Sequence, residues 1–236
     1  MAEKTNKNDF IELDFTAMTL PDNLVFDTTS KDEATKAELP TEKREFKPSI
    51  IAVGHKMLIQ GLDKVLEGKE IGKQYAEEIE PEQAFGKRIP TLVKMLSLNQ
   101  FKNQNIAPQK GMQFNLDGQI ATIRAVTGGR VLVDFNNPLA GKKVKYNFKI
   151  KRKITDQKEK VNSLQDYFFR QTFPFTTKEK TITFQVEKNI EPLIKIMSKP
   201  FEEILGMKIA VKVAEEKKEA SKSKTSEDDN KNSQPR

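Results

Sequence analysis

The chain of 236 residues has no cysteine and no tryptophan, and His55 is its single histidine. Without cysteine there can be no disulfide framework, no thiolate nucleophile and no zinc–thiolate site. One histidine excludes a histidine-rich metal site and disfavours a Ser-His-Asp triad. The side chains that most often perform covalent and metal chemistry are therefore missing or scarce.

Long apolar runs are also missing. No stretch of 18 apolar residues occurs, so the sequence predicts no segment that spans a membrane. The first ten residues, MAEKTNKNDF, lack the apolar stretch of a secretory signal. We therefore expect a cytoplasmic protein.

Positive charge is present but local. The formal net charge is +7, and residues 142–160 hold nine basic and two acidic side chains. In this segment apolar residues alternate with lysines, which predicts a half-buried strand. The segment FIELDFTA near the N-terminus alternates in the same way with acidic residues, so an acidic strand and a basic strand could pair in one sheet. The alternative is a basic face that binds nucleic acid, the ribosome or an acidic partner.

The first 87 residues predict a sheet and one helix. Apolar spacing predicts a helix over 58–66, ended by Gly68. Residues 29–45 are polar and charged and predict a long loop. Strands are expected at 9–18, 24–29, 49–54 and 72–81.

Later segments predict two further folding units. From Met112 to Phe135 the pattern indicates strands, with hairpin signals at 117–118 and 128–129. A helix at 156–170, a strand at 181–187, a helix at 190–205 broken at Pro200, and a last strand at 207–213 fit a small α/β domain. Residues 215–236 contain nothing that could bury a core, which predicts a disordered tail.

Three segments carry a resemblance to a known family: GHKMLIQGLDKVLEGKEIGK, EQAFGKR and NPLAGKKVKYNFKI. Their motifs and order over about 9–153 resemble the FKBP-type peptidyl-prolyl isomerases. The chain is most similar to the SlyD-like branch, whose members carry a second domain inserted after the AFG motif. The C-terminal extension resembles the long archaeal form.

This resemblance implies an α+β fold in which a bent antiparallel sheet surrounds one short helix. It also implies an inserted small β-rich domain and a small C-terminal α/β domain. The domains expected are a flexible N-terminus at 1–8, a catalytic domain at 9–87 with 139–153, the insert at 88–138, the C-terminal domain at 154–214, and the tail at 215–236.

Prolyl isomerisation makes and breaks no covalent bond, so it needs no nucleophile, metal or cofactor. Its barrier of about 18–20 kcal/mol reflects the partial double bond of the amide. A dry pocket with few polar groups lowers this barrier by favouring the twisted amide. By resemblance, Asp27 is the polar group at the pocket edge and Ile59 offers a backbone N–H. The pocket walls implied by the resemblance are Phe15, Phe26, Leu58, Ile59, Leu62, Phe85 and Tyr146.

The chain departs from its relatives at several positions. Many relatives carry tryptophan where this chain has Leu62, and tyrosine where it has Phe85, so a phenolic donor is missing. Asn137 stands where SlyD-like chains often have histidine. The histidine-rich tail of some bacterial members is absent, and we expect no nickel site.

The insert is rich in apolar residues for its length. Some of them must form the core of its sheet, and others would suit a surface that binds extended unfolded chains. The residues expected to bind substrate are Leu92, Met95, Leu96, Phe101, Met112 and Phe114.

The function expected is a peptidyl-prolyl cis-trans isomerase that also acts as a chaperone. Its partners would be unfolded or partly folded polypeptides with X-Pro bonds. The alternative is a non-catalytic chaperone, or a module that binds the ribosome or nucleic acid through 142–160, although no nucleic-acid motif supports it. A phenylalanine cluster within 154–214 indicates either self-association or the core of that domain.

Overall fold

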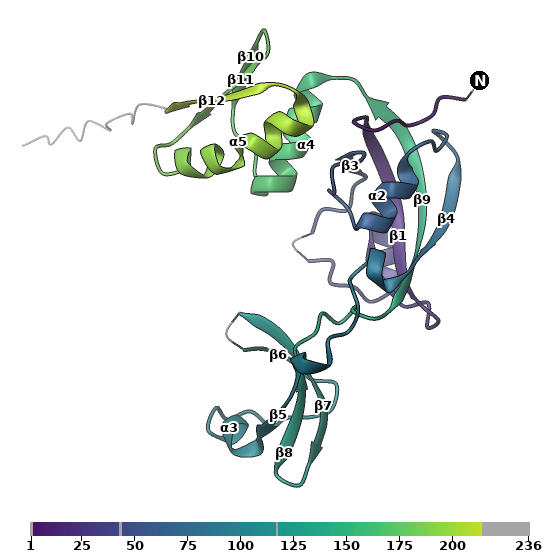
Figure 1. Ribbon diagram of the computed structural model, residues 1–236, viewed down its shortest axis with the longest axis vertical. Coiled ribbons are helices and arrows are strands. Elements are labelled where there is room, and N and C mark those ends of the chain that lie inside the picture. Colours follow the sequence, from purple (N-terminus) through teal and green to yellow (C-terminus); the bar gives the residue numbers. More distant parts are fainter. Residues whose placement is uncertain (1, 43, 117, 214–236) are drawn as a thin grey trace, which may run out of the picture. The chain divides into compact units, whose positions relative to one another are not determined.

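The computed structural model of the protein describes residues 2–42, 44–116 and 118–213 (Figure 1). The chain divides between Thr172 and Phe173 into two compact units. The tail predicted at 215–236 lies outside the described residues. The elements of the first unit are β1 Phe10–Leu20, β2 Val25–Thr28, α1 Lys31–Lys36, β3 Ser49–Ala52, α2 Gln60–Leu66, β4 Gln74–Ile79, η1 Pro81–Gln83, η2 Pro90–Leu92, β5 Val93–Ser97, α3 Leu98–Lys102, β6 Gln113–Leu116, β7 Gln119–Thr127, β8 Arg130–Asp134, β9 Lys143–Ile154 and α4 Gln157–Phe169.

Strand β1 lies at the centre of a five-stranded antiparallel sheet. It pairs with β9 from Phe10, opposite Ile154, to Leu20, opposite Lys143. Its other edge is shared, because β3 pairs with its first half and β2 with its second half. Strand β4 adds to the far edge of β9. The predicted antiparallel sheet with one short helix, α2, beside it is confirmed (Figure 1).

Acidic side chains of β1 lie beside basic side chains of β9. Lys151 Nζ lies 3.1 Å from a carboxylate oxygen of Asp14. Arg152 Nε lies 2.5 Å from one of Glu12. The predicted pairing of an acidic strand with a basic strand is confirmed, so part of the charge of 142–160 is balanced within the sheet.

The apolar faces of the sheet and of α2 form the core of this unit. Leu62 and Leu66 of α2 are fully buried. Gly61 approaches β4 closely, since a Cβ at this position would lie 2.3 Å from Ile79 Cγ2. The alternation predicted for β9 is confirmed by its buried residues Val144, Tyr146, Phe148 and Ile150.

Two polar segments are more ordered than the sequence predicted. Thr5 is buried, its N–H donates to the Lys69 carbonyl over 3.0 Å, and its own carbonyl accepts from Gly68. The described part of the N-terminus is therefore held against the core. In the predicted loop 29–45, α1 forms because Ser30 Oγ accepts from the Glu33 N–H, as the S-x-x-E spacing of a capping box allows.

The insert folds as a four-stranded antiparallel sheet of order β5-β8-β7-β6. Both predicted hairpins are confirmed by the pairs β6–β7 and β7–β8. The sequence reading missed β5 and α3. Its core consists of Phe101, Ala121, Ile123, Val131 and Val133.

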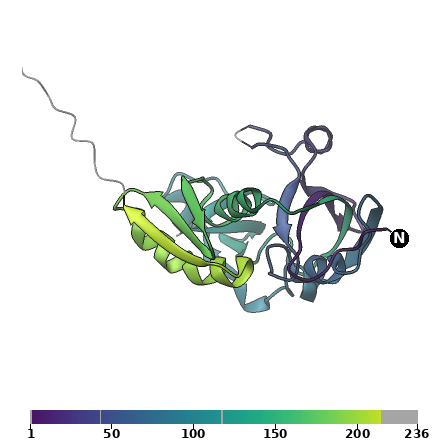
Figure 2. The ribbon, with the colours of Figure 1, turned by 90° about the horizontal axis from the view of Figure 1, so that it is seen from above.

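Over its described residues, 173–213, the second unit contains three strands and one helix, and Figure 2 shows α5 along one face of the sheet. The predicted order of strand, helix and strand is confirmed by β11, α5 and β12, and β11 and β12 pair in parallel; β10 was missed. The predicted break is wrong, because α5 continues through Pro200 and ends at Gly206. Proline removes the hydrogen bond to the carbonyl of Ile196, a residue that is 70% exposed. The elements are β10 Phe175–Lys178, β11 Thr181–Val186, α5 Glu191–Leu205 and β12 Lys208–Val213.

Helix α4 belongs to the first unit. The predicted C-terminal domain begins at 154, whereas the second unit begins at Phe173. Lys47, just before β3, lies 3.5 Å from Asp166 of α4, and Arg152 of β9 bonds to Glu159. In the described ranges, no helix is long and apolar enough to cross a membrane.

Candidate functional site

Four aromatic rings meet beside the central strands of the first unit. The Phe15 and Tyr146 centroids lie 5.8 Å apart, and those of Phe26 and Phe85 lie 5.6 Å apart at 83°. Phe26 also meets Tyr146 edge-on at 6.2 Å. These four predicted wall residues therefore form one cluster, and all four line a cavity of about 1510 Å³.

Hydrogen bonds from the end of β2 fix the position of Phe15. Thr29 Oγ1 accepts from the Phe15 N–H, and Thr28 Oγ1 donates to the Phe15 carbonyl, each over 3.0 Å. Thr29 also donates to Asp14 over 3.1 Å. Because β1 is hydrogen-bonded on both sides here, the Phe15 ring is held in a defined place at the cavity wall.

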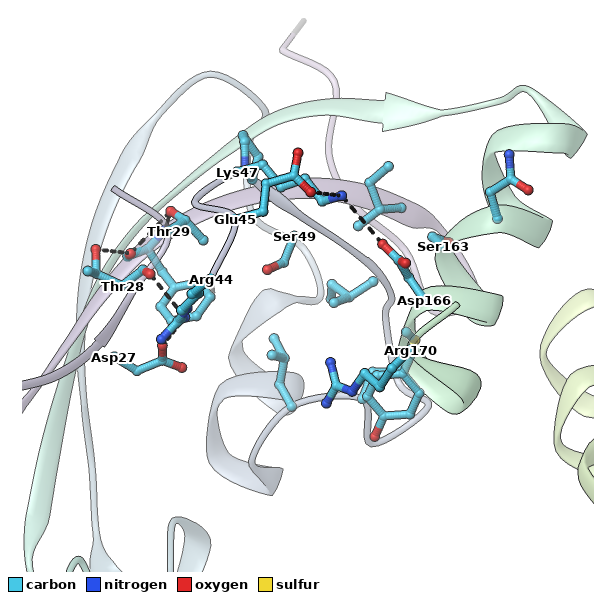
Figure 3. A pocket seen from close by; sticks show the side chains of 18 of the residues that line it. Asp27, Thr28, Thr29, Arg44, Glu45, Lys47, Ser49, Ser163, Asp166 and Arg170 are labelled. Carbon is cyan, nitrogen blue, oxygen red and sulfur yellow. Dashed lines mark hydrogen bonds and ion pairs between the residues drawn. The ribbon is translucent and has the colours of Figure 1, made fainter. Parts of the chain in front are cut away.

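Asp27 lies at the cavity edge, as predicted, and it forms an ion pair with Arg44. Arg44 Nη2 donates to Asp27 Oδ1 over 2.5 Å and to the Thr28 carbonyl over 3.2 Å (Figure 3). The ion pair balances the carboxylate and fixes its orientation. The sequence reading missed Arg44, because nothing in a polar segment marks one arginine among other charged residues.

Tyr146 brings the hydroxyl group of this cluster. The residue is 4% exposed. Burial, and after it the negative charge of Asp27, raise the pKa of Tyr146 far above its usual value. Within the part of the chain that the structure describes, no group hydrogen-bonds to the Tyr146 hydroxyl, so this neutral hydroxyl can donate to a molecule in the cavity.

Leu58 and Ile59 lie at the entry to α2 instead of inside a helix over 58–66. The helix begins at Gln60 with Ile59 as its N-cap. Buried Asp63 holds the preceding turn, accepting from the Gly54 and Lys56 N–H groups over 2.8 and 2.9 Å. Both predicted residues therefore line the cavity from a fixed turn. Asp63 was missed, although its place in GLDKVLEG lies within the recognised motif.

Phe85 projects from the tight turn that follows η1. The Gly86 N–H donates to the Pro81 carbonyl over 2.7 Å, and the Gly141 N–H donates to the Gly86 carbonyl over 2.8 Å. Gly86 has a φ of +80°, a conformation that glycine adopts without strain. The turn thus fixes Phe85 and joins the two chain segments that lead to the insert.

Leu62 is placed differently from the other predicted wall residues. Its side chain is fully buried between α2 and the sheet, and it is not among the residues that line the cavity. The prediction that Leu62 is a wall of the pocket is therefore wrong for this cavity, and Leu62 is a core residue.

The cavity extends beyond the predicted residues onto α4. Its far wall consists of polar α4 residues that the sequence reading assigned to another domain. They include Asn162, Ser163, Asp166, Tyr167 and Arg170. Among the described residues, no group of three or more His, Cys, Asp or Glu side chains could hold a metal ion.

Comparisons with known proteins identify the family of this chain. The chain is 30% identical over 151 residues to the short-type peptidyl-prolyl cis-trans isomerase of Methanocaldococcus jannaschii, which covers 64% of this chain and 95% of that protein. It is 33% identical over 132 residues to the FKBP-type 16 kDa peptidyl-prolyl cis-trans isomerase of Escherichia coli K12, which covers 54% of this chain and 87% of that protein. The chain belongs to the FKBP-type peptidyl-prolyl cis-trans isomerases.

Two further comparisons bear on the branch of this FKBP-type isomerase. The SlyD isomerase of Haemophilus influenzae is 31% identical over 101 residues, which covers 41% of this chain and 53% of that protein. A family model described as the FKBP26 IF domain matches residues 94–139. The FKBP-type, SlyD-like resemblance found in the sequence is thereby confirmed.

The structure places the predicted substrate residues of the isomerase's insert in three different surroundings. Phe101 is buried in the core, and Leu96 and Phe114 pack against it. Met95 and Met112 are exposed by 59% and 37%. Leu92 ends η2 and is half-buried.

The junction of the insert is held by one buried carboxylate. Asp134 is 2% exposed and bonds to Arg88, Arg124 and Asn136. Although burial alone raises the pKa of this carboxyl, hydrogen bonds from Asn136 and Arg124 and the charge of Arg88 hold the pKa below its usual value. Asn136 in turn bonds to both backbone groups of Ile89, so the entering and leaving segments are joined.

Proposed function

We propose that the protein speeds X-Pro isomerisation in folding polypeptides, with the prolyl ring held between the clustered aromatic side chains. The observation that supports this best is the meeting of four rings from three strands and a turn, with one ion-paired carboxylate at the edge. An apolar pocket favours the twisted amide, which is less dipolar than the planar one. Leu58 and Ile59 would complete the walls, and the Ile59 N–H would bind a substrate carbonyl.

A proline-limited refolding assay tests this proposal. Phe85→Ala should slow both refolding and the turnover of a short prolyl peptide, since it removes one wall of the pocket and leaves the sheet intact. Phe135→Ala, in the insert, is the matched control and should leave peptide turnover unchanged. Equal turnover by Phe85→Ala and the unmodified protein would contradict the assigned pocket.

We further propose that the insert acts as a chaperone by binding unfolded segments. Met95, Leu132 and Ala125 lie opposite one another on β5, β8 and β7, so they share one face of the sheet. The neighbours of Leu132 along β8 are buried in the core, so this row lies on the opposite face. Ile120, next to buried Ala121, faces the same side and is 59% exposed. Leu132 and Ala125 are half-buried, so the exposed apolar side chains of this face are Met95 and Ile120, which suit the binding of extended chains.

The double change Met95→Lys and Ile120→Lys should reduce the acceleration of refolding and spare the turnover of a short peptide. A bound chain held near the prolyl pocket raises the local concentration of its proline bonds. Ile196→Lys, at a 70% exposed residue of the second unit, is the control. If refolding is unaffected, or if the control has the same effect, the insert is not the binding surface.

A basic module that binds nucleic acid or the ribosome has less support. Lys143 and Lys153 lie 2.9 and 2.8 Å from Glu78 and Asp9, so several positive charges of 142–160 have acidic partners. Self-association through 154–214 and a cytoplasmic location stay predictions. Sedimentation of the full chain tests the first, because a monomer at all concentrations would contradict it.

A further inference from the structure

The cavity is larger than the proposed prolyl site needs. Its volume is about 1510 Å³, whereas pockets that enclose a whole drug-sized ligand measure about 300–1,000 Å³. One end is aromatic, and the other is bounded by α4 and by the segment before β3. A polypeptide bound by its proline therefore has room for neighbouring residues along α4.

Most charged groups around the cavity are already paired. Arg44 bonds to Asp27. Lys47 Nζ lies 2.9 Å from Glu45 and 3.5 Å from Asp166. These pairs leave few charges of the wall available to a ligand.

Two basic residues of the wall, Lys158 and Arg170, form no ion pair over the described ranges. Arg170 ends α4 in the left-handed conformation, with φ at 57° and its N–H bonded to the Asp166 carbonyl over 3.2 Å. Figure 3 shows its guanidinium reaching toward the middle of the cavity. Over the described ranges, no carboxylate forms an ion pair with it. Tyr167, also on the cavity wall, is 37% exposed and offers an aromatic surface.

We propose that Arg170 and Tyr167 form a second substrate subsite, which binds an aspartate or glutamate side chain a few residues from the proline. This inference rests on the proposed function, because the proline must occupy the aromatic end. An extended chain advances about 3.3–3.6 Å per residue, so a few residues can cross the cavity. A guanidinium binds a carboxylate through two parallel hydrogen bonds, and an aromatic face beside it supports the aliphatic part of the side chain.

Peptide pairs test the subsite in the full-length protein. Each pair shares one X-Pro bond and differs only by glutamate or glutamine, placed two to five residues before or after the proline. At low salt, one position should give a kcat/KM about two- to fivefold higher for glutamate, and the preference should fall as salt rises. A tetrapeptide without an acidic residue measures the prolyl site alone.

Variants of Arg170 test whether this residue causes the preference for glutamate over glutamine. Arg170→Gln should remove the preference for glutamate and Arg170→Lys should keep part of it, each measured relative to the same variant's turnover of the tetrapeptide. Lys149→Gln removes an equal charge from an exposed site on β9 outside the cavity and should keep the preference. Equal rates for all pairs with the unmodified protein, or a preference that survives Arg170→Gln, would overturn the subsite. No turnover of the tetrapeptide would instead overturn the proposed function, and the subsite with it.

Discussion

Replacing Tyr146 with phenylalanine removes one oxygen atom from the candidate site and keeps the aromatic ring. The aromatic contacts to Phe15 and Phe26, at 5.8 and 6.2 Å, do not involve this oxygen. No described group hydrogen-bonds to it. The free energy of unfolding at neutral pH should therefore change by less than about 1 kcal/mol, because no internal hydrogen bond is lost.

Catalysis should change more than stability if the hydroxyl donates to the twisted amide. A neutral hydrogen bond contributes about 0.5–1.5 kcal/mol, and each 1.4 kcal/mol is about tenfold in rate. Tyr146→Phe should therefore lower kcat/KM for a short prolyl peptide about two- to tenfold. Tyr75→Phe, which removes another hydroxyl of the same sheet, is the control for peptide turnover, since Tyr75 bonds to the Glu70 N–H and does not line the cavity.

The raised pKa of Tyr146 adds a second measurement. A group whose pKa is higher in the folded state contributes stability that is complete below its unfolded pKa of about 10 and is lost as pH rises through the folded value. The unmodified protein should therefore lose stability above about pH 10 relative to Tyr146→Phe, in urea titrations at pH 8, 10 and 11. An unchanged kcat/KM in Tyr146→Phe would refute the donor role, and a large loss of stability at pH 8 would reveal an internal partner.

Three further predictions concern the pocket, the insert and α2. Phe85→Ala should lower kcat/KM about five- to thirtyfold, since about 1–2 kcal/mol of ring burial against the substrate is lost; a peptide assay checks this. Asp134→Asn should destabilise the insert by about 2 kcal/mol, measured by hydrogen exchange. Because the pKa of Asp134 is lowered, its contribution is present above about pH 4 and lost as pH falls through the folded value, so the variant should be less sensitive to acid. Gly61→Ala should cost about 1–3 kcal/mol in thermal unfolding, because its Cβ would overlap Ile79.

Strand pairing in the catalytic sheet could be predicted from alternation alone. The apolar and charged faces of β1 and β9 have a period of two, and opposite charges face each other across the pair. The short strands β5 and β10 were harder to predict from the sequence. β5 lacks regular alternation, and β10 has four residues, so tertiary contacts decide their conformation more than local sequence does.

The positions of Leu58 and Ile59 show the same limit within the site. Helical spacing includes them in a helix, but the Gly54 and Lys56 N–H groups donate to buried Asp63 and hold the preceding turn, so the helix begins at Gln60. Such bonds depend on where the chain folds back, and the periodicity of the apolar residues carries no information about that position. The motif nonetheless placed both residues at the pocket.

The sequence by itself determined the family and the antiparallel sheet, and seven of the eight residues it named for the prolyl pocket line the cavity. Absence of cysteine and scarcity of histidine agreed with a reaction that needs only a dry pocket. Tertiary structure decided which residues of the insert are core and which are exposed, and it brought Arg44 and α4 to the cavity. These contacts join segments far apart in the chain, and a pattern within one segment has no information about which distant side chain will lie across from it.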